Sequence, residues 1–545
     1  MDFVAEDFTD DERERLAPFF TNLDGPVFAL INLPEVVKGA LFARYSRSPK
    51  SLRRLFLDEF ALGGPEGPGP SPSGAGIDVG VGRAEQLYER VFLEYGDDSV
   101  AQLGGVHLAC EQASQLLAKV LEWGRLAAYL EQSTRYVPYD DQPGGRWRYH
   151  IPVELDPHPE LRERYARTLD AAFDTYARWL GPMQEFYRGL FPKDPADSDF
   201  VYRMTIRAKA CDTLRGLLPA ATRSNVGIFA TAQAYEQMLL RMRANPLAEV
   251  RWCADLILTE LRKVIPAFLT RVDNPERGGR WTGYLDETRA ATEEIATKLL
   301  GGLEPEARPI LTLTEFDLDG ELKVVAAALY AASDLPDDQL MEVVRGMTED
   351  ERTAVLESYV GERTNRRHKP GRAFERTSYR FDVLCDYGAF RDLQRHRLLT
   401  IEWQPLTTAH GFTMAPEVER AGAGEDWAKV MTTCGELFEA LRDAGLGDAA
   451  QYAIPMASRI RFVMQMNARE AMHLIELRTT PQGHPEYRQV AQTMHDLIDR
   501  QAGHHAIARA MTYVDHSAVE LERLEAERRT EAKRRRSPAG GGPQA

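Results

Sequence analysis

Two short stretches, EQSTRY at residues 131–136 and RHRLLT at residues 395–400, together indicate how this chain folds. They lie in opposite halves of the 545-residue chain, and each keeps polar or basic groups that the matching stretch of the other half lacks. Put end to end, the two stretches form one site signature, which predicts a single site built from two copies of one domain. A chain of this length is long enough for two or three domains, so a duplication fits it.

Three pairs of segments recur in the same order in the two halves, which is the mark of an internal repeat. The second pair joins a strand to a helix. In its later copy Tyr379, Phe381 and Val383 alternate with polar neighbours, as a half-buried strand requires. The pairs are residues 42–48 (FARYSRS) with 327–333 (AALYAAS), residues 105–125 with 378–397, and residues 218–223 (LPAATR) with 454–459 (IPMASR).

The repeats predict an α+β fold of two tandem domains, each a twisted sheet with long packed helices. The stretch DNPERGGR at residues 273–280 is the predicted linker, which puts the boundary near residue 290. We expect a first repeat at residues 1–290, a second at 291–527, and a disordered basic tail at 528–545.

Composition disfavours several classes of protein. With 43% apolar and 28% charged residues the chain is typical of globular proteins, and it has no run of about 18 apolar residues, the length that a membrane span needs. No signal peptide is visible, so we expect a cytoplasmic protein. The net charge of −16 disfavours nucleic-acid partners. The five cysteines are far apart and form no Cys-x-x-Cys pair, so we expect buried, reduced thiols, no disulfide framework and no metal.

The two opening stretches resemble the active-site signature of flavin-dependent thymidylate synthases. In that family Arg-His-Arg, two spacers, Ser, one spacer, Asn-Glu, one spacer, Ser, one spacer and Arg-Tyr run together without a break. The resemblance implies FAD as cofactor, dUMP as substrate, methylenetetrahydrofolate as carbon donor and NADPH as reductant. No Gly-x-Gly-x-x-Gly fingerprint is present, so the flavin site would not be of the Rossmann type.

By this resemblance the first half keeps the nucleotide side of the site. Arg135 would hold the phosphate of dUMP, while Glu131 and Ser133 would make polar contacts. A Glu-x-Ser-x-Arg-Tyr loop is also typical of a helix-capping turn, but the presence of Arg215 in register disfavours that alternative. The predicted dUMP-binding residues are Glu131, Ser133, Arg135, Tyr136, Arg215 and Arg243.

The second half keeps the flavin side. Arg395, His396 and Arg397 would contact FAD, although a basic last turn that complements the helix dipole would look the same. Asn467 and Arg478 are eleven residues apart and share one helix face, where capping or a solvated stripe is the alternative. We take Ala232, Ala234, Met238 and Arg243 as the first-repeat counterparts of this helix. The predicted FAD-binding residues are Ser46, Ser99, Glu375, Arg395, His396, Arg397, Thr400, Asn467, Arg469, His473 and Arg478.

Neither copy of the signature is complete. Trp123-Gly124-Arg125 stands where the first repeat would have Arg-His-Arg, and Pro405 and Thr407 stand where the second would have Ser and Arg. Family members are homotetramers whose sites draw on several subunits, so the resemblance implies a homodimer that imitates the tetramer. Whether the cleft forms within or between chains stays open.

Three functions are compatible with these residues. The first is methylation of dUMP to dTMP. The second is flavin- and folate-dependent methylation of another pyrimidine nucleotide, motivated by the altered Asp97, Ala128 and Leu130. The third is a non-catalytic nucleotide-binding protein of the same fold.

Overall fold

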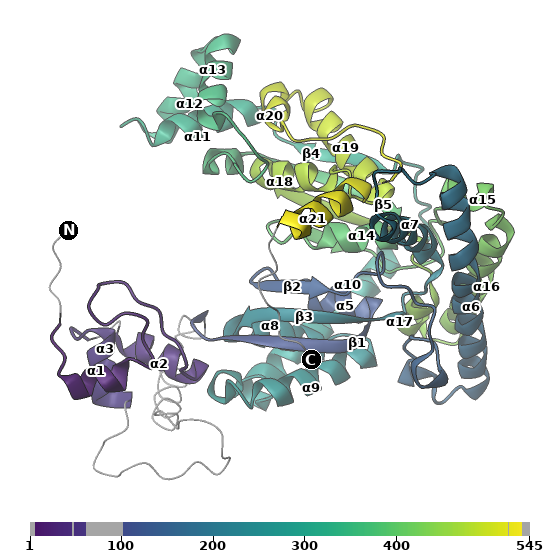
Figure 1. The fold of residues 1–545 in the computed structure, drawn as a ribbon, viewed down its shortest axis with the longest axis horizontal. Coiled ribbons are helices and arrows are strands. Elements are labelled where there is room, and N and C mark those ends of the chain that lie inside the picture. The colour runs from purple at the N-terminus through teal and green to yellow at the C-terminus, as the bar shows by residue number, and fades with distance from the viewer. Residues whose placement is uncertain (1–5, 46–47, 61–101, 522, 537–545) are drawn as a thin grey trace. The chain divides into compact units, whose positions relative to one another are not determined.

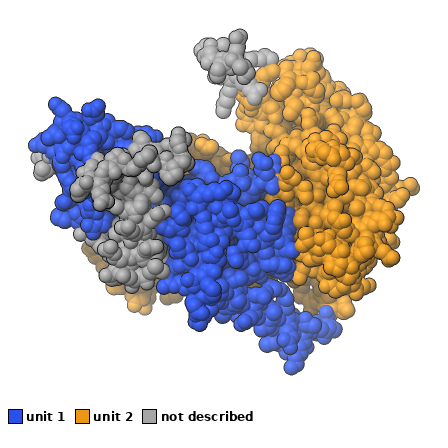
Figure 2. All heavy atoms as spheres, turned by 90° about the horizontal axis from the view of Figure 1, so that it is seen from below, with its two compact units in different colours: residues 1–111, 126–131, 225–303 blue, residues 112–125, 132–224, 304–545 orange. Residues whose placement is uncertain are grey.

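The computed structural model describes residues 6–45, 48–60, 102–521 and 523–536 (Figure 1). The predicted site residues Ser46 and Ser99, and the altered Asp97, lie outside these ranges. The chain separates into two compact units. The first unit comprises residues 1–111, 126–131 and 225–303, and the second unit comprises residues 112–125, 132–224 and 304–545 (Figure 2).

The first unit contains a three-stranded sheet covered by helices. Its strands follow the order β1-β3-β2, and β2 pairs with β3 in antiparallel register, with Ala127 opposite Ala230. Val226 and Ile228 of β3 are buried, and the hydroxyl of Tyr235 donates to the carbonyl of Val106 at 3.0 Å, which ties the helix after β3 to the sheet. The elements are α1 (Asp10–Leu16), α2 (Glu35–Tyr45), α3 (Leu52–Leu55), β1 (Gly105–Ser114), β2 (Ala127–Glu131), β3 (Arg223–Thr231), α8 (Ala232–Arg243), α9 (Ala248–Leu261) and α10 (Arg280–Leu300); β1 and β3 continue into the second unit.

The second unit contains a four-stranded antiparallel sheet, β4-β5-β7-β6, with helices packed on it and beside it (Figure 1). The predicted strand with Tyr379, Phe381 and Val383 on one face is confirmed as β5, where these side chains are fully buried. The elements are α5 (Gln115–Leu121), α6 (Pro159–Leu190), α7 (Asp199–Leu214), β4 (Leu311–Phe316), α11 (Gly320–Tyr330), α12 (Asp337–Gly346), α13 (Glu349–Val360), β5 (Ser378–Asp386), α14 (Tyr387–Gln394), β6 (Thr400–Trp403), α15 (Pro416–Arg420), α16 (Gly424–Asp443), α17 (Gly447–Ala450), β7 (Arg459–Asn467), α18 (Ala468–Arg478), α19 (Pro485–Arg500), α20 (His505–Ala510) and α21 (Leu524–Arg536).

The internal repeat is visible in the order and the caps of these elements. The strand–helix pair β1–α5 matches β5–α14, with Ser114 and Asp386 as N-caps that accept a backbone N–H three residues on. The pair β3–α8 likewise matches β7–α18, with Thr231 and Asn467 as N-caps. The chain is therefore a tandem duplication of one mixed helix-and-sheet domain.

These caps correct the predicted alignment of the two repeats. The counterpart of Asn467 is Thr231, and not Ala232, because both residues cap the helix that follows the strand. The same one-residue shift places Gln233, Gln237 and Met242, and not Ala234, Met238 and Arg243, opposite Arg469, His473 and Arg478. The pattern of side chains alone did not distinguish between two alignments of the repeats that differ by one residue.

The third pair of repeat segments forms a reciprocal contact inside the second unit. The N–H of Ala220 donates to the carbonyl of Ile454 at 2.8 Å, and the N–H of Met456 donates to the carbonyl of Leu218 at 2.9 Å. These two bonds are equivalent when the repeats are exchanged, as a local two-fold relation requires. The two Leu/Ile-Pro segments therefore join the repeats around a local axis.

The compact units do not follow the predicted boundary, because residue 290 lies inside α10 and the second unit contains parts of both halves. The division into repeats at residues 1–290 and 291–527 stays a prediction. Residues 528–536 of the predicted disordered tail belong to the helix α21. Arg528 binds Asp197 through Nε at 2.6 Å and Nη2 at 2.9 Å, which ties this helix to the end of a loop before α7.

All five cysteines are free and buried, as predicted. Among the described residues, no helix combines the length and the apolar character needed to span a membrane.

Candidate active site

Arginines from both halves of the chain meet in the second unit. Arg135, from the loop after β2, forms two hydrogen bonds with Asp212 on α7, from Nε to Oδ1 at 2.8 Å and from Nη2 to Oδ2 at 2.7 Å. Its Nη1 donates to the hydroxyl of Tyr487 on α19 at 3.1 Å, and its Nη2 donates to the carbonyl of Gln482 at 3.2 Å. The loop of the first half that carries Arg135 is thereby fastened to the second half of the same chain.

Asp392 on α14 lies among three arginines. Its carboxylate is 3.6 Å from Nη1 of Arg215, 3.6 Å from Nη1 of Arg395 and 3.8 Å from Nη1 of Arg478. Burial alone would raise the pKa of Asp392, but Arg395, Arg478 and Arg215 outweigh it and hold this pKa far below its ordinary value. Asp392 is therefore an internal counter-ion shared by arginines of both repeats.

Asp212 is also ionised inside the protein. Burial opposes ionisation, but the charge of Arg135, with contributions from His484 and Arg215, holds the pKa of Asp212 well below its usual range. Burial lowers the pKa of His484 to about 3, so this imidazole is neutral at neutral pH. The buried arginines Arg135, Arg215 and Arg478 thus face two ionised carboxylates, those of Asp212 and Asp392.

Arg215 has hydrogen-bonding capacity to spare. Its side chain is only 5% exposed, and its ion pairs with Asp212 and Asp392 measure 3.5 and 3.6 Å, too long for good hydrogen bonds. Its Nη2 has no hydrogen-bond partner among the described residues. A buried N–H without a partner costs about 1–3 kcal/mol, so an oxygen acceptor from a ligand would be stabilising here.

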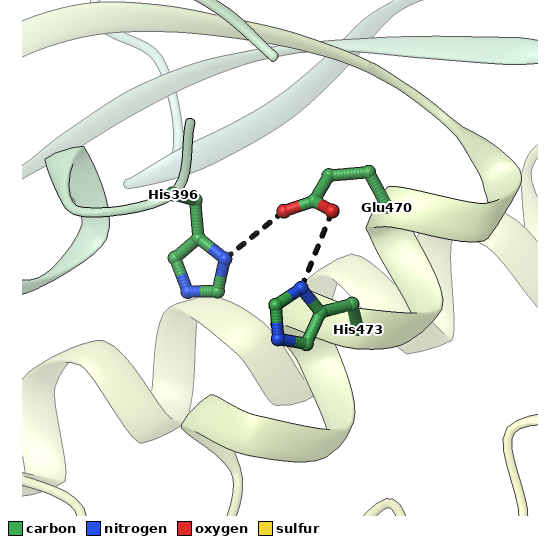
Figure 3. A group of neighbouring side chains, drawn as sticks. All are labelled: His396, Glu470 and His473. Atoms are coloured by element: carbon green, nitrogen blue, oxygen red, sulfur yellow. Dashed lines mark hydrogen bonds and ion pairs between the residues drawn. The ribbon is translucent and has the colours of Figure 1, made fainter. Parts of the chain in front are cut away.

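A hydrogen-bonded chain runs from Arg478 through two histidines and a glutamate, and Figure 3 shows the part formed by His396, Glu470 and His473. Nε of Arg478 donates to Nε2 of His396 at 3.0 Å, Nδ1 of His396 is 3.1 Å from Glu470, and the other oxygen of Glu470 is 3.3 Å from Nδ1 of His473. A guanidinium only donates, so Nε2 of His396 accepts and the ring proton is on Nδ1, facing Glu470.

Electrostatics agree with this assignment. Burial lowers the pKa of His396 to about 4, which keeps the imidazole neutral. Burial opposes ionisation of Glu470, but hydrogen bonds from His396 and His473 lower its pKa to about 2. Side-chain nitrogens and oxygens of His396, Glu470 and His473 lie within 4.8 Å of one another, a spacing that could also hold a metal ion. The contacts are accounted for as hydrogen bonds, and the absence of a metal stays a prediction.

Several predicted residues make local structural contacts instead. Oδ1 of Asn467 accepts the N–H of Glu470 at 2.9 Å, so this side chain caps α18. Nε of Arg469 donates to the carbonyl of Pro370 at 2.9 Å, and its Nη1 is 3.5 Å from Glu375. These contacts match the alternative of a capped and solvated helix face.

The remaining predicted residues are distributed over both units. Arg395, Arg397 and Thr400 are exposed at and after the end of α14. Oγ of Ser133 accepts the N–H of Arg135 at 3.2 Å, and the guanidinium of Arg523 lies 3.9 Å from the ring centre of Tyr136. Glu131 and Arg243 belong to the first unit, where Glu131 is buried and Arg243 pairs with Asp255 at 2.7 Å.

Sequence reasoning missed both buried aspartates. Asp212 stands three residues before Arg215, and Asp392 stands three residues before Arg395, each within one turn of its arginine. That spacing was the available signal. Tyr487 and His484 carried no comparable signal, because tertiary folding alone brings them to the arginines.

On the other side of the local axis, two tryptophans stand at the positions that match Arg395 and Glu131. Trp123 is the counterpart of Arg395, since each lies nine residues after the N-cap of its helix, and Trp403 is the counterpart of Glu131, since each ends its strand. Trp123 and Trp403 meet edge to face with ring centres 6.0 Å apart. Nη2 of Arg125 donates to Thr400 at 3.2 Å. Two of the predicted site residues, Arg395 and Glu131, are thus matched by tryptophans in the other copy.

A family model described as thymidylate synthase complementing protein matches the chain twice, over residues 71–267 and 312–502. The chain belongs to this family. The two matches within one chain agree with the repeated caps and strands described above.

Two kinds of relatives are found. A protein named UPF0159 from Chlamydia muridarum is 38% identical over 529 residues, covering 96% of this chain and 99% of the relative. A UPF0159 protein from Thermoplasma acidophilum is 30% identical over 519 residues, covering 91% and 99%. A flavin-dependent thymidylate synthase from Mycobacterium avium is 26% identical over 213 residues, covering 39% of this chain and 76% of the relative.

Proposed function

We propose that this protein is a flavin-dependent methyltransferase that converts dUMP to dTMP, with methylenetetrahydrofolate as carbon donor and NADPH as reductant. One observation carries the proposal. Arg135 and Arg215 of the first half lie in one cluster with Arg395, His396 and Arg478 of the second half, inside a single compact unit. The two incomplete copies of the signature are thereby complementary in space, which supports one site per chain.

The flavin side fits the residues present. Arg395 and Arg397 are exposed at the end of α14, so their guanidinium groups are accessible to the phosphates of a dinucleotide. Bound FAD would supply the hydride that converts the transferred one-carbon unit into a methyl group. The role of His396 is to orient Arg478, because its Nε2 holds Nε of that guanidinium while Glu470 fixes its tautomer.

On the nucleotide side, Arg215 is the best-placed residue to hold an oxygen of the substrate. Its Nη2 is buried without a partner, whereas the fork of Arg135 is already filled by Asp212. We therefore assign phosphate or carbonyl recognition to Arg215 and a positioning role to Arg135. This assignment refines the prediction that Arg135 itself holds the phosphate.

The two aspartates favour the second candidate function, another pyrimidine acceptor. Asp212 and Asp392 are both ionised beside the arginines and reduce the positive charge that the phosphate of dUMP would meet. A less highly charged pyrimidine would match that reduced charge better. The third hypothesis is a non-catalytic nucleotide-binding protein. It predicts that the protein binds no flavin, although Arg395 and Arg397 are exposed.

Tritium release from C5-labelled dUMP tests the proposal, because loss of that hydrogen accompanies methylation at C5. Purified protein with FAD, NADPH and methylenetetrahydrofolate should release tritium only when all three are present. Arg215→Gln should lower release by about tenfold to a hundredfold, since a hydrogen bond to a charged group contributes about 1.5–3 kcal/mol. The exposed Arg500→Gln is the matched control and should leave the rate unchanged.

Other outcomes separate the three functions. No release from a yellow, flavin-loaded protein would favour another pyrimidine acceptor. No release from a protein that stays colourless in excess FAD would favour the non-catalytic function.

A further inference from the structure

Two histidines and an aspartate gather beside α19, outside the arginine–aspartate cluster. His495 and Asp496 belong to α19, and His516 belongs to the segment that follows α20. One nitrogen or oxygen atom from each side chain lies within 4.8 Å of those of the other two. Nε2 of His516 is 3.1 Å from Nδ1 of His495. None of the three belongs to the predicted flavin or nucleotide site, so their grouping needs an explanation of its own.

The protonation of His495 leaves one ring nitrogen with a lone pair. Its Nε2 is 3.2 Å from the carbonyl oxygen of Ala508, and a carbonyl only accepts, so the ring proton is on Nε2. Nδ1 therefore presents its lone pair towards His516. This is the usual arrangement of a metal-binding histidine, which donates its other ring N–H to a backbone carbonyl or a carboxylate.

The separation of the two histidine nitrogens matches two ligands of one ion. Zinc–nitrogen bonds of about 2.0–2.1 Å at a tetrahedral angle place two nitrogens about 3.3 Å apart. The separation of Nδ1 of His495 and Nε2 of His516 is 3.1 Å. A hydrogen bond between the two rings has a similar length, so a further observation must decide between the two arrangements.

Asp496 favours the ion. An oxygen of its carboxylate lies within 4.8 Å of both histidine nitrogens, yet this side chain has no hydrogen-bond or ion-pair partner among the described residues. In the otherwise similar group of Figure 3, the glutamate accepts hydrogen bonds from both histidine rings. A hydrogen bond between His495 and His516 would leave the Asp496 carboxylate unused, whereas a bound cation takes it as a third ligand.

The backbone on either side of His516 is fastened to the helix that carries the other two ligands. Nε2 of Gln492 donates to the carbonyl of the residue before His516 at 2.8 Å, and Nη2 of Arg488 donates to the carbonyl of the residue after it at 3.0 Å. Arg488, Gln492 and His495 are spaced by four and then three residues, so they lie on one face of α19. These contacts hold His516 beside His495 before an ion binds, which lowers the entropy cost of binding.

We propose that His495, Asp496 and His516 bind a divalent transition-metal ion such as Zn²⁺, through Nδ1, a carboxylate oxygen and Nε2. Imidazole ligands favour such an ion over Mg²⁺ or Ca²⁺, which prefer oxygen. His516 is exposed, so water reaches the remaining coordination position. The expectation that the chain holds no metal was based on its cysteines, which are not part of this group. The ion links the segment after α20 to α19, and the site goes beyond the proposed function because it uses none of the residues assigned there.

Calorimetric titration of the full-length, untagged protein with ZnCl₂, after removal of metals by a chelator, tests the proposal. One Zn²⁺ should bind per chain. His516→Gln and Asp496→Asn should each weaken binding at least about tenfold, since even the outer partners of metal ligands contribute about tenfold to a hundredfold to affinity. His505→Gln is the matched control and should bind Zn²⁺ like wild type, because His505 is exposed and pairs with Asp499 at 2.9 Å outside the group.

Thermal denaturation gives a second readout, because an ion that binds only the folded chain raises its melting temperature. At one Zn²⁺ concentration the melting temperature should rise in wild type and His505→Gln, and by less in His516→Gln. Absence of Zn²⁺ binding, or unchanged affinity in either His516→Gln or Asp496→Asn, would overturn the proposal. Loss of binding in His473→Gln with His516→Gln unaffected would place the ion in the group of Figure 3, and would overturn it as well.

Discussion

Arg135 and Asp212 are joined by two parallel hydrogen bonds, Nε to Oδ1 at 2.8 Å and Nη2 to Oδ2 at 2.7 Å, and both side chains are buried. Such a bidentate pair fixes both the position and the plane of the guanidinium. The pair therefore holds the loop that follows β2 against α7.

Arg135→Ala should lower the free energy of unfolding by about 3–5 kcal/mol, because it leaves the Asp212 carboxylate buried without its main partner. Urea denaturation followed by circular dichroism measures this loss. Arg167→Ala is the control, since Arg167 and Glu163 form an exposed pair in the same unit, with both side chains 71% exposed; it should change stability by less than about 0.5 kcal/mol. Equal effects of the two variants would argue against the structural role of the buried pair.

Gly216→Ala should destabilise the protein by about 1–3 kcal/mol through overpacking. A Cβ at Gly216 would lie 2.6 Å from Cη2 of the buried Trp427, and a rigid ring cannot move aside easily. Gly435→Ala, inside α16, meets only a methyl group of Thr408 at 3.5 Å and should be neutral or stabilising by up to about 1 kcal/mol. Thermal denaturation compares the two variants; a higher melting temperature for Gly216→Ala would contradict the packing described at Trp427.

His396 should make stability depend on acid pH. Its pKa falls to about 4 in the folded protein from about 6.5 in the unfolded chain, so the unfolded chain binds the extra proton between these values. The contribution of neutral His396 to the free energy of unfolding is therefore fully present above pH 6.5 and falls as pH drops towards 4. Comparing wild type with His396→Gln by urea denaturation at several pH values isolates this residue.

The size of the His396 effect follows from the same linkage. His396→Gln should reduce the slope by up to about 1.4 kcal/mol per pH unit between pH 4 and 6.5. His484, with a pKa lowered to about 3, contributes in the same sense, and Glu486, with a pKa raised to about 7, contributes in the opposite sense. His484 and Glu486 are both present in the variant, so the difference in slope between wild type and His396→Gln reports on His396. An unchanged slope would mean that His396 is protonated in the folded state.

One flavin should bind per chain if the proposed function holds, because Trp123 and Trp403 stand across the local axis where the predicted site has Arg395 and Glu131. The ratio of flavin absorbance to protein concentration after saturation and gel filtration measures this number. A ratio of two flavins per chain would show that the copy with the two tryptophans is still a competent site.

Much of the fold followed from sequence because it rests on local patterns. Alternating residues in β5 and the recurrence of Leu/Ile-Pro segments gave the strands, the repeat and the helix after each strand. The repeat alignment also predicted that Trp123-Gly124-Arg125 stand at the position of Arg-His-Arg. The structure places these three residues just after α5, as Arg395-His396-Arg397 follow α14.

The pairing of buried charges could not be predicted in the same way. Asp212 and Asp392 become site residues only because α7 and α14, which come from different repeats, approach one another in the folded chain. The one-residue register between Asn467 and Thr231 was likewise fixed by capping geometry rather than by pattern. Neither feature changes the composition or the periodicity of the segment that carries it.

We propose that each site is built within one chain from both repeats, and this can be tested by co-expressing two differently tagged, singly inactivated chains. One chain carries Arg215→Gln and the other Arg478→Gln, and the purified mixed dimer is assayed for tritium release from labelled dUMP beside wild type. Every chain then holds one damaged half of its own site, so we predict an active wild type and no recovered release in the mixed dimer. Recovery to about half of the wild-type rate would mean that one repeat of each chain completes the site of its partner, and would contradict the claim.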